Sequence, residues 1–158
     1  MINRRGFVIR VSGLVAAGVA GGRLAAEVPG WSAKPTPITV YKSSSCECCA
    51  KWVDHVRDSG FEPVVHDEED MDAIKVQLGV PEQVRSCHTA LVDKYLIEGH
   101  VPGFDIQRLV RQQPAVAGLA VPGMPSGTPG MAQPGAKITG FEVVAFQRDG
   151  TTKRFARY

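Results

Sequence analysis

The 158-residue sequence has no apolar run long enough to cross a membrane. Its N-terminal uncharged stretch, residues 11–22, has 12 residues, whereas a transmembrane helix needs about 20. Internal repeats and a glycine-rich phosphate-binding motif are also missing. These absences argue against a stable membrane span, a repeat architecture and a phosphate site built on such a loop.

The N-terminus instead predicts export. Arg4 and Arg5 precede the uncharged stretch and small residues follow it, which is the order of a cleaved signal. Residues 3–8 resemble the twin-arginine pattern, which implies export in the folded state. We therefore expect an export signal at residues 1–26, a tether with prolines and glycine at residues 27–37, and one periplasmic domain at residues 38–158.

The positive formal charge belongs to the predicted signal. The whole sequence carries +2, and removal of residues 1–26, which contain four arginines and no acidic residue, leaves −2. Binding to nucleic acid needs a clustered basic face. The composition therefore argues against a nucleic-acid partner.

Three of the four cysteines, Cys46, Cys48 and Cys49, fall within four positions. A β-branched and aromatic run precedes them and a helical pattern follows, so they lie where a strand turns into a helix. The start of a helix favours thiolate over thiol, and thiolates bind soft metals or carry out redox chemistry. A structural disulfide is the alternative, but a bridge from Cys46 to Cys49 closes so small a loop that it would contribute only about 2 kcal/mol.

Cys87 and His88 form a second candidate site, just before a predicted β-hairpin. Such a pair is usually structural on its own, but a cysteine cluster elsewhere in the chain makes it a candidate ligand pair. For His100 we favour a structural hydrogen-bonding role over ligation. His55 is expected on the surface of the first helix.

Residues 122–131 are rich in proline and glycine and cannot form a helix or a central strand. One interpretation is a low-complexity linker. The other is a loop whose Met124 and Met131 serve as soft metal ligands or cover a site. The sequence leaves both open.

The remaining patterns predict an α/β fold. Helices are expected at residues 50–59, 70–78 and 104–111, with strands at 38–41, 61–65, 90–92 and 95–97 and a closing β-hairpin at 141–146 and 152–155. Pro63 places the second strand at an edge. The expected apolar stripes of the three helices are Cys49, Trp52, Val53 and Val56, then Met71, Ile74 and Leu78, then Phe104, Ile106, Leu109 and Val110.

Several ordered motifs resemble those of the periplasmic CopG-type copper-resistance proteins. They are the runs at residues 41–52, 79–81, 86–90, 98–102, 118–125 and 129–131, which span nearly all of the predicted domain. The resemblance implies a thioredoxin-like fold, with a mixed sheet and flanking helices. It also implies copper handling, with Cys46, Cys48, Cys49, Cys87 and His88 as ligands.

Residues and resemblance together predict an exported protein that binds Cu(I) through thiolates in copper resistance. Soft donors favour Cu(I), although Cys46, Cys49, Cys87 and His88 could also form a zinc site. Interconversion of Cu(I) and Cu(II), catalysis, and a periplasmic partner for copper or electrons stay open. The competing functions are a structural zinc or disulfide module and a thioredoxin-like thiol-disulfide oxidoreductase. The third thiol, Cys48, argues against the oxidoreductase, because it offers the reactive pair a wrong disulfide partner.

Overall fold

The computed structural model describes residues 34–133 and 135–158, which belong to one compact unit, Ser32–Tyr158. The predicted export signal and most of the predicted tether lie outside the described residues, so both stay predictions. Strand β1 begins at Thr36 and so includes the last two residues of that tether. Among the described residues, no helix has the length and apolar character that a membrane span requires.

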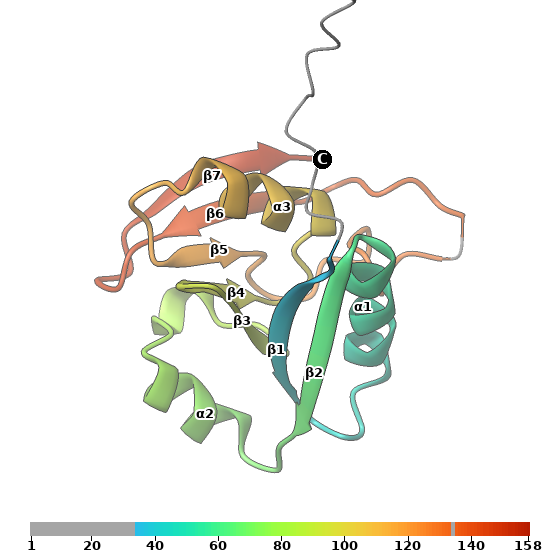
Figure 1. Cartoon of the computed structure of the whole chain (residues 1–158), viewed down its shortest axis with the longest axis horizontal. Coiled ribbons are helices and arrows are strands. Elements are labelled where there is room, and N and C mark those ends of the chain that lie inside the picture. Colours follow the sequence, from blue (N-terminus) through green and yellow to red (C-terminus); the bar gives the residue numbers. More distant parts are fainter. Residues whose placement is uncertain (1–33, 134) are drawn as a thin grey trace, which may run out of the picture. The chain divides into compact units, whose positions relative to one another are not determined.

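Seven strands form one mixed sheet in the order β2-β1-β3-β4-β5-β6-β7 (Figure 1). Strand β1 pairs in parallel with β2, and β4 with β5, while the other pairs are antiparallel. The strands are β1 Thr36–Lys42, β2 Phe61–Asp67, β3 Thr89–Val92, β4 Tyr95–Glu98, β5 Gly118–Ala120, β6 Glu142–Phe146 and β7 Thr152–Arg157. The predicted α/β class is confirmed, including the edge position of β2 and the closing hairpin, and the arrangement is compatible with a thioredoxin-like fold.

In the described part of the chain, three α-helices flank the sheet, α1 Glu47–Asp58, α2 Met71–Leu78 and α3 Gly103–Gln112, with a short 3-10 helix at Glu82–Val84. Helices α1 and α2 lie on opposite sides of strands β1 and β2 (Figure 1). The backbone N–H of Gly103 donates to His55 Nε2 at 3.0 Å, which ties the start of α3 to α1. The expectation that His55 is only a surface residue is therefore wrong, because its ring caps a neighbouring helix.

The apolar stripe expected for α1 is confirmed. Cys49, Trp52, Val53 and Val56 are its buried residues. Trp52 donates from Nε1 to the carbonyl of Val101 at 2.9 Å, which fixes the rotation of the helix against the chain that enters α3. Because Cys49 shares this stripe, packing of the helix decides which way the first turn presents its sulfur atoms.

Helix α2 differs from its expected stripe. Met71, Ile74 and Leu78 are only half-buried, whereas Lys75 is 3% exposed. A lysine is seldom buried without a partner, and here the partner is Glu98 of β4. The apolar core on this face comes from residues after the helix and from the sheet, namely Val80, Val84, Leu96, Ala120 and Phe146.

The segment between β5 and β6 contains no helix or strand in its described residues, as predicted. It packs on the first turns of α1, however, rather than running free as a linker. A Cβ atom on Gly130 would lie 2.7 Å from the Cys48 carbonyl oxygen and 2.9 Å from the Trp52 nitrogen, and Gly130 has a φ of +83°. Only glycine permits both this conformation and this approach, so the loop covers the cysteine turn at close range.

Candidate metal centre

The first three cysteines lie at the turn between β1 and α1, where the sequence predicts them. The Cys46 N–H donates to the Ser43 carbonyl at 3.1 Å, and Cys46 is the N-cap residue of α1. Cys46 and Cys49 form a disulfide, with Cα atoms 5.3 Å apart, whereas Cys48 and Cys87 are free thiols. The small loop was expected to disfavour this bridge, but residues three apart on a helix already have a suitable spacing.

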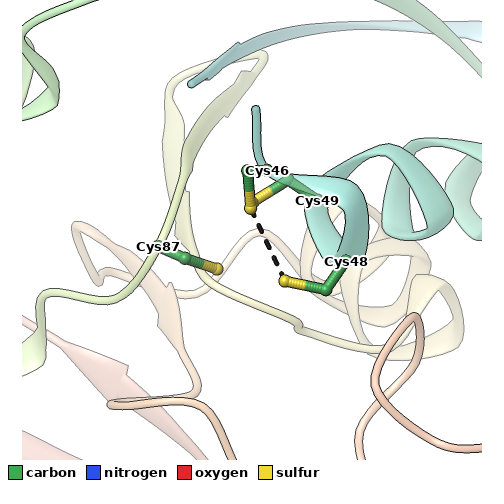
Figure 2. Close-up of side chains that lie close together, drawn as sticks. All are labelled: Cys46, Cys48, Cys49 and Cys87. Carbon is green, nitrogen blue, oxygen red and sulfur yellow. Dashed lines mark hydrogen bonds between the residues drawn. A yellow bond between two sulfur atoms is a disulfide. The ribbon is translucent and has the colours of Figure 1, made fainter. Parts of the chain in front are cut away.

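Cys87 approaches this turn from the segment before β3. Figure 2 shows its sulfur pointing toward Cys48 and the disulfide. The sulfur atoms of Cys46 and Cys48 are 3.5 Å apart, and all four cysteine sulfurs lie within 4.8 Å of one another. Two segments about forty positions apart in the sequence therefore form one cluster.

His100 extends the cluster with a ring nitrogen. Its Nδ1 lies 2.6 Å from the Pro129 carbonyl oxygen, and its Nε2 lies 3.0 Å from the sulfur of Cys87. A carbonyl oxygen can only accept, so Nδ1 carries the proton and Nε2 keeps a lone pair. His100 thus makes the hydrogen bond expected of it, and the lone pair facing Cys87 is an additional feature.

His88 is completely buried beside these groups. Its ring centre lies 4.2 Å from that of Trp52 and 5.1 Å from that of His100. Its Nδ1 is 3.4 Å from the Cys87 sulfur, while its buried Nε2 has no hydrogen-bond partner among the described residues. Leaving a buried polar atom without a partner costs free energy, and coordination of a metal ion would satisfy it.

A second group of donors overlaps the cysteine cluster. It consists of Cys49, Cys87, His88 and His100, whose ligand atoms also lie within 4.8 Å of one another. Cys49 and Cys87 belong to both groups. The arrangement therefore offers two adjoining donor sets that share two sulfur atoms.

Burial sets the protonation of the centre. It raises the pKa of Cys87 to about 11, with the neighbouring Cys48 charge adding to the effect. Burial also lowers the pKa of His100 and lowers that of His88 well below its ordinary range. Both imidazoles are therefore neutral and able to ligate at neutral pH. With a raised pKa, Cys87 holds its proton at neutral pH.

Comparison with known proteins identifies the family. The family model described as "Protein of unknown function, DUF411" matches residues 84–131. Two solved structures, of copper resistance protein copG in forms 1 and 2, are 42% and 41% identical to this chain, with TM-scores of 0.72 and 0.71. Each covers 79% of this chain, which in turn covers 98% and 99% of theirs. The chain belongs to the CopG family. No curated protein sequence matches it.

In this CopG family member, the structure brings together five of the seven predicted ligands, Cys46, Cys48, Cys49, Cys87 and His88. The two methionines lie elsewhere on the covering loop. Met124 is 58% exposed, and Met131 lines a surface pocket with Lys51, Asp54 and His55 of α1. Ligation by either methionine stays a prediction.

The CopG-type motif Glu98-Gly99-His100 contains a signal for this contact that the expected role of His100 did not include. Thr89 pairs with Glu98 in the hairpin of β3 and β4. Continuing that antiparallel register by two residues sets Cys87 opposite His100. A hairpin centred on Asp93 and Lys94 was expected from the sequence. Its register could therefore have placed His100 beside Cys87 and made it a candidate member of the centre.

Proposed function

We propose that this protein binds copper as Cu(I) at the cysteine and histidine centre and acts in copper resistance in the periplasm. The observation that carries the proposal is the convergence of four cysteine sulfurs and two buried imidazoles in a chain of the CopG family. Thiolate donors are soft and select Cu(I), whereas carboxylate and carbonyl oxygens would suit magnesium or calcium. Copper is the cargo of the centre in this proposal.

The proposed ligands are Cys46, Cys48, Cys49, Cys87 and His88, and the geometry adds His100. The hydrogen bond from His100 Nδ1 to the Pro129 carbonyl orients the ring and directs Nε2 to Cys87. Such partners fix the tautomer and the angle of a ligating histidine. Because the two donor sets share Cys49 and Cys87, bridging thiolates would let the centre hold more than one ion.

Metal binding requires the reduced form of the centre, because the disulfide ties up the sulfur atoms of Cys46 and Cys49. The same pair can also supply electrons. Two Cu(II) ions that accept one electron each from the two thiols become two Cu(I) ions, and the thiols form the disulfide and release two protons. Interconversion of Cu(I) and Cu(II) is therefore part of the proposal, and a partner protein for copper or electrons stays a prediction.

A thiol-disulfide oxidoreductase is the second candidate, and the Cys46–Cys49 disulfide at the start of α1 favours it. Against it, the Cys48 sulfur lies 3.5 Å from Cys46 and competes for the mixed disulfide that such an enzyme forms. This function also leaves Cys87, His88 and His100 without a task. Zinc is the competing metal, since the same donors suit it.

Anaerobic titration of the reduced protein tests the proposal. Cu(I) is competed against a chromogenic chelator, and Zn(II) is titrated in parallel. We expect Cys48→Ser and Cys87→Ala to lose bound Cu(I), with His88→Ala weaker in effect, because an imidazole ligand is more readily exchanged than a thiolate. Disulfide reductase activity should be low in all of these proteins.

Ser44→Ala, on the exposed part of the same turn, is the matched control and should bind Cu(I) normally. Full retention of copper in both cysteine variants would contradict the metal centre. Ordinary reductase activity that survives Cys48→Ser would favour the oxidoreductase. If the affinity for Zn(II) exceeds the affinity for Cu(I) obtained from the chelator competition, zinc is the metal of the centre.

A further inference from the structure

A buried ion pair lies on the α2 face of the sheet, behind the segment that carries Cys87. Lys75 of α2 is 3% exposed, and Glu98 at the end of β4 is completely buried. Their ammonium and carboxylate groups form a salt bridge. Neither residue belongs to the two donor groups of the centre, so ligation of copper does not explain why the chain buries two charges here.

The Glu98 carboxylate accepts hydrogen bonds on both of its oxygens. One oxygen accepts from Lys75 Nζ and, at 2.6 Å, from the backbone N–H of Ser86. The other accepts from the Thr89 hydroxyl at 2.6 Å, and the hydroxyl oxygen accepts from Lys75 Nζ at 2.9 Å. Lys75, Ser86 and Thr89 all donate to the Glu98 carboxylate, so both of its oxygens have hydrogen-bond partners although the residue is buried.

The bond to Ser86 connects this network to the metal centre. Ser86 directly precedes Cys87 and lies before the start of β3, so its N–H donates to a side chain rather than to a neighbouring strand. The Gly99 N–H donates to the His88 carbonyl at 2.9 Å on the other side of Cys87. Cys87 is therefore held between two bonds, both of which come from consecutive residues at the end of the β4 hairpin.

Two further contacts tighten the same segment. The Ser86 hydroxyl donates to the Gly123 carbonyl, which joins the segment to the covering loop. Gly99 permits the close approach, because a Cβ atom there would lie 2.5 Å from Ser86 Oγ. The Glu98 side chain, the Gly99 backbone and the covering loop thus all contact Ser86, the residue next to Cys87.

Stability alone gives little reason for the pair. Replacing a buried ion pair by apolar side chains of similar volume is often neutral or stabilising. The position of a metal ligand has a stricter requirement, because all donors must reach the ion at bonding distance. Groups that orient a ligand are for this reason worth about 10- to 100-fold in metal affinity.

We propose that Glu98 is a positioning residue for Cys87, and that Lys75 is the counter-charge of its buried carboxylate. The inference rests on the proposed copper-binding function. By holding the Ser86 amide, Glu98 keeps the Cys87 sulfur opposite the α1 cysteines before an ion arrives. The ion then binds without first ordering this ligand, which lowers the free-energy cost of binding.

Two double variants separate the hydrogen bond from the charges. Lys75→Met with Glu98→Gln removes both charges but keeps an amide oxygen that can accept from the Ser86 N–H. Lys75→Met with Glu98→Leu removes both charges and the acceptor. Because glutamine and leucine are close in size, a difference between these variants reports the hydrogen bond to Ser86.

Two readouts are compared in both variants and in the unmodified protein. The first is Cu(I) affinity of the reduced protein, from competition with a chromogenic chelator. The second is the alkylation rate of Cys87 relative to Cys48 in the reduced, metal-free protein, mapped by mass spectrometry. We expect the glutamine variant to keep both values. The leucine variant should bind Cu(I) about 10- to 100-fold more weakly, with a changed alkylation ratio although thermal unfolding shows that it is folded.

Unchanged affinity and an unchanged alkylation ratio in the leucine variant would overturn the proposal. Equal losses in the two variants would also overturn it, because the charges would then carry the effect. If the unmodified protein binds no Cu(I), the proposed function fails, while the alkylation ratio still tests the position of Cys87.

Hydrogen exchange of the Ser86 amide needs no variant and decides the matter if the leucine protein does not fold. Slow exchange in the unmodified protein supports the bond to Glu98. Exchange as fast as in the exposed turn at Asp93 and Lys94 would contradict it.

Discussion

His55 joins two helices through a ring nitrogen that must be neutral. Its Nε2 accepts the N–H of Gly103, the first residue of α3. Burial lowers the pKa of His55 below its ordinary value of 6.5, which the Asp58 charge offsets only in part. Protonation would remove the lone pair that caps α3, so geometry and burial both favour the neutral ring.

The effect of His55 on stability should therefore depend on pH. A histidine with a lowered pKa in the folded state contributes its stability above pH 6.5 and loses it as the pH falls below that value, because the unfolded chain binds the proton more readily. We expect His55→Ala to lower the free energy of unfolding by about 1 kcal/mol above pH 6.5 and by less below it. Urea denaturation of the metal-free protein at one pH above 6.5 and one below it measures this difference. Lys51→Ala, on the exposed face of α1, is the control. A loss that does not change with pH would contradict the cap.

Single residues also show where prediction from sequence stops. The positions of Cys46, Cys48 and Cys49 were predictable, because a strand pattern, a turn and a helical pattern follow one another within a few residues. The lone pair of His100 and the burial of Lys75 were not predicted. Both depend on partners 13 to 29 residues away in the sequence. A pattern within one helix or strand does not show such partners, and for His100 only the register of the expected hairpin does.

At the scale of elements, the C-terminal strand is fastened to α3 by a polar contact. The Tyr158 hydroxyl donates to Asp105 Oδ2 at 2.8 Å, and Arg108 contacts the other oxygen at 3.0 Å. Burial raises the pKa of Asp105, and the bond from Tyr158 opposes that rise. The ring of Tyr158 also stacks on Phe141, with centres 4.9 Å apart.

Tyr158→Phe keeps this stacking and removes the hydroxyl. Because the acceptor is a buried charged group, we expect the free energy of unfolding to fall by about 1.5–3 kcal/mol. Tyr95→Phe is the matched comparison, since the Tyr95 hydroxyl donates to the neutral carbonyl of Pro114 at 3.0 Å, and should cost about 1 kcal/mol. Urea denaturation measures both. A smaller cost at Tyr158 than at Tyr95 would show that the contact with Asp105 adds no charged hydrogen bond.

The helices differ in how well their buried faces followed from the sequence. In α1 the apolar residues alone determine the face, and the prediction is confirmed. In α3, Phe104 was expected in the apolar stripe but is 61% exposed, whereas Asp105 is buried. Ile106 and Leu109 of the expected stripe are completely buried. The partners of Asp105 are Arg108 on α3 itself and Tyr158, so a polar contact adds Asp105 to the buried face of this helix.

At the scale of the whole molecule, the alternation of helix and strand patterns predicted the α/β class, and the closing hairpin followed from its turn. The course of residues 121–141 did not follow, because a segment rich in proline and glycine has no periodicity that shows what it packs against. Gly130 provides the reason in retrospect, since its close approach to α1 needs a residue without a side chain.

Export is the remaining prediction at this scale, and it concerns residues outside the described part. Replacing Arg4 and Arg5 by lysine should leave precursor in the cytoplasm, because the twin-arginine pattern requires both arginines. Cell fractionation with detection of the precursor measures this, and lysine at Arg10 is the control. Normal periplasmic delivery of the Arg4 and Arg5 variant would exclude the twin-arginine route.

In the proposed centre, the sulfur atoms of Cys46 and Cys49 can bond to each other or bind an ion, but they cannot do both. An ion that binds only the dithiol form draws the dithiol–disulfide equilibrium toward reduction by mass action. Thermodynamic linkage is reciprocal, so an oxidising environment lowers the affinity for the ion by the same factor. Each tenfold change in that equilibrium corresponds to about 30 mV in the two-electron midpoint potential. A more oxidising environment therefore lowers the copper affinity of the proposed centre. A higher copper concentration in turn raises the midpoint potential of its cysteine pair.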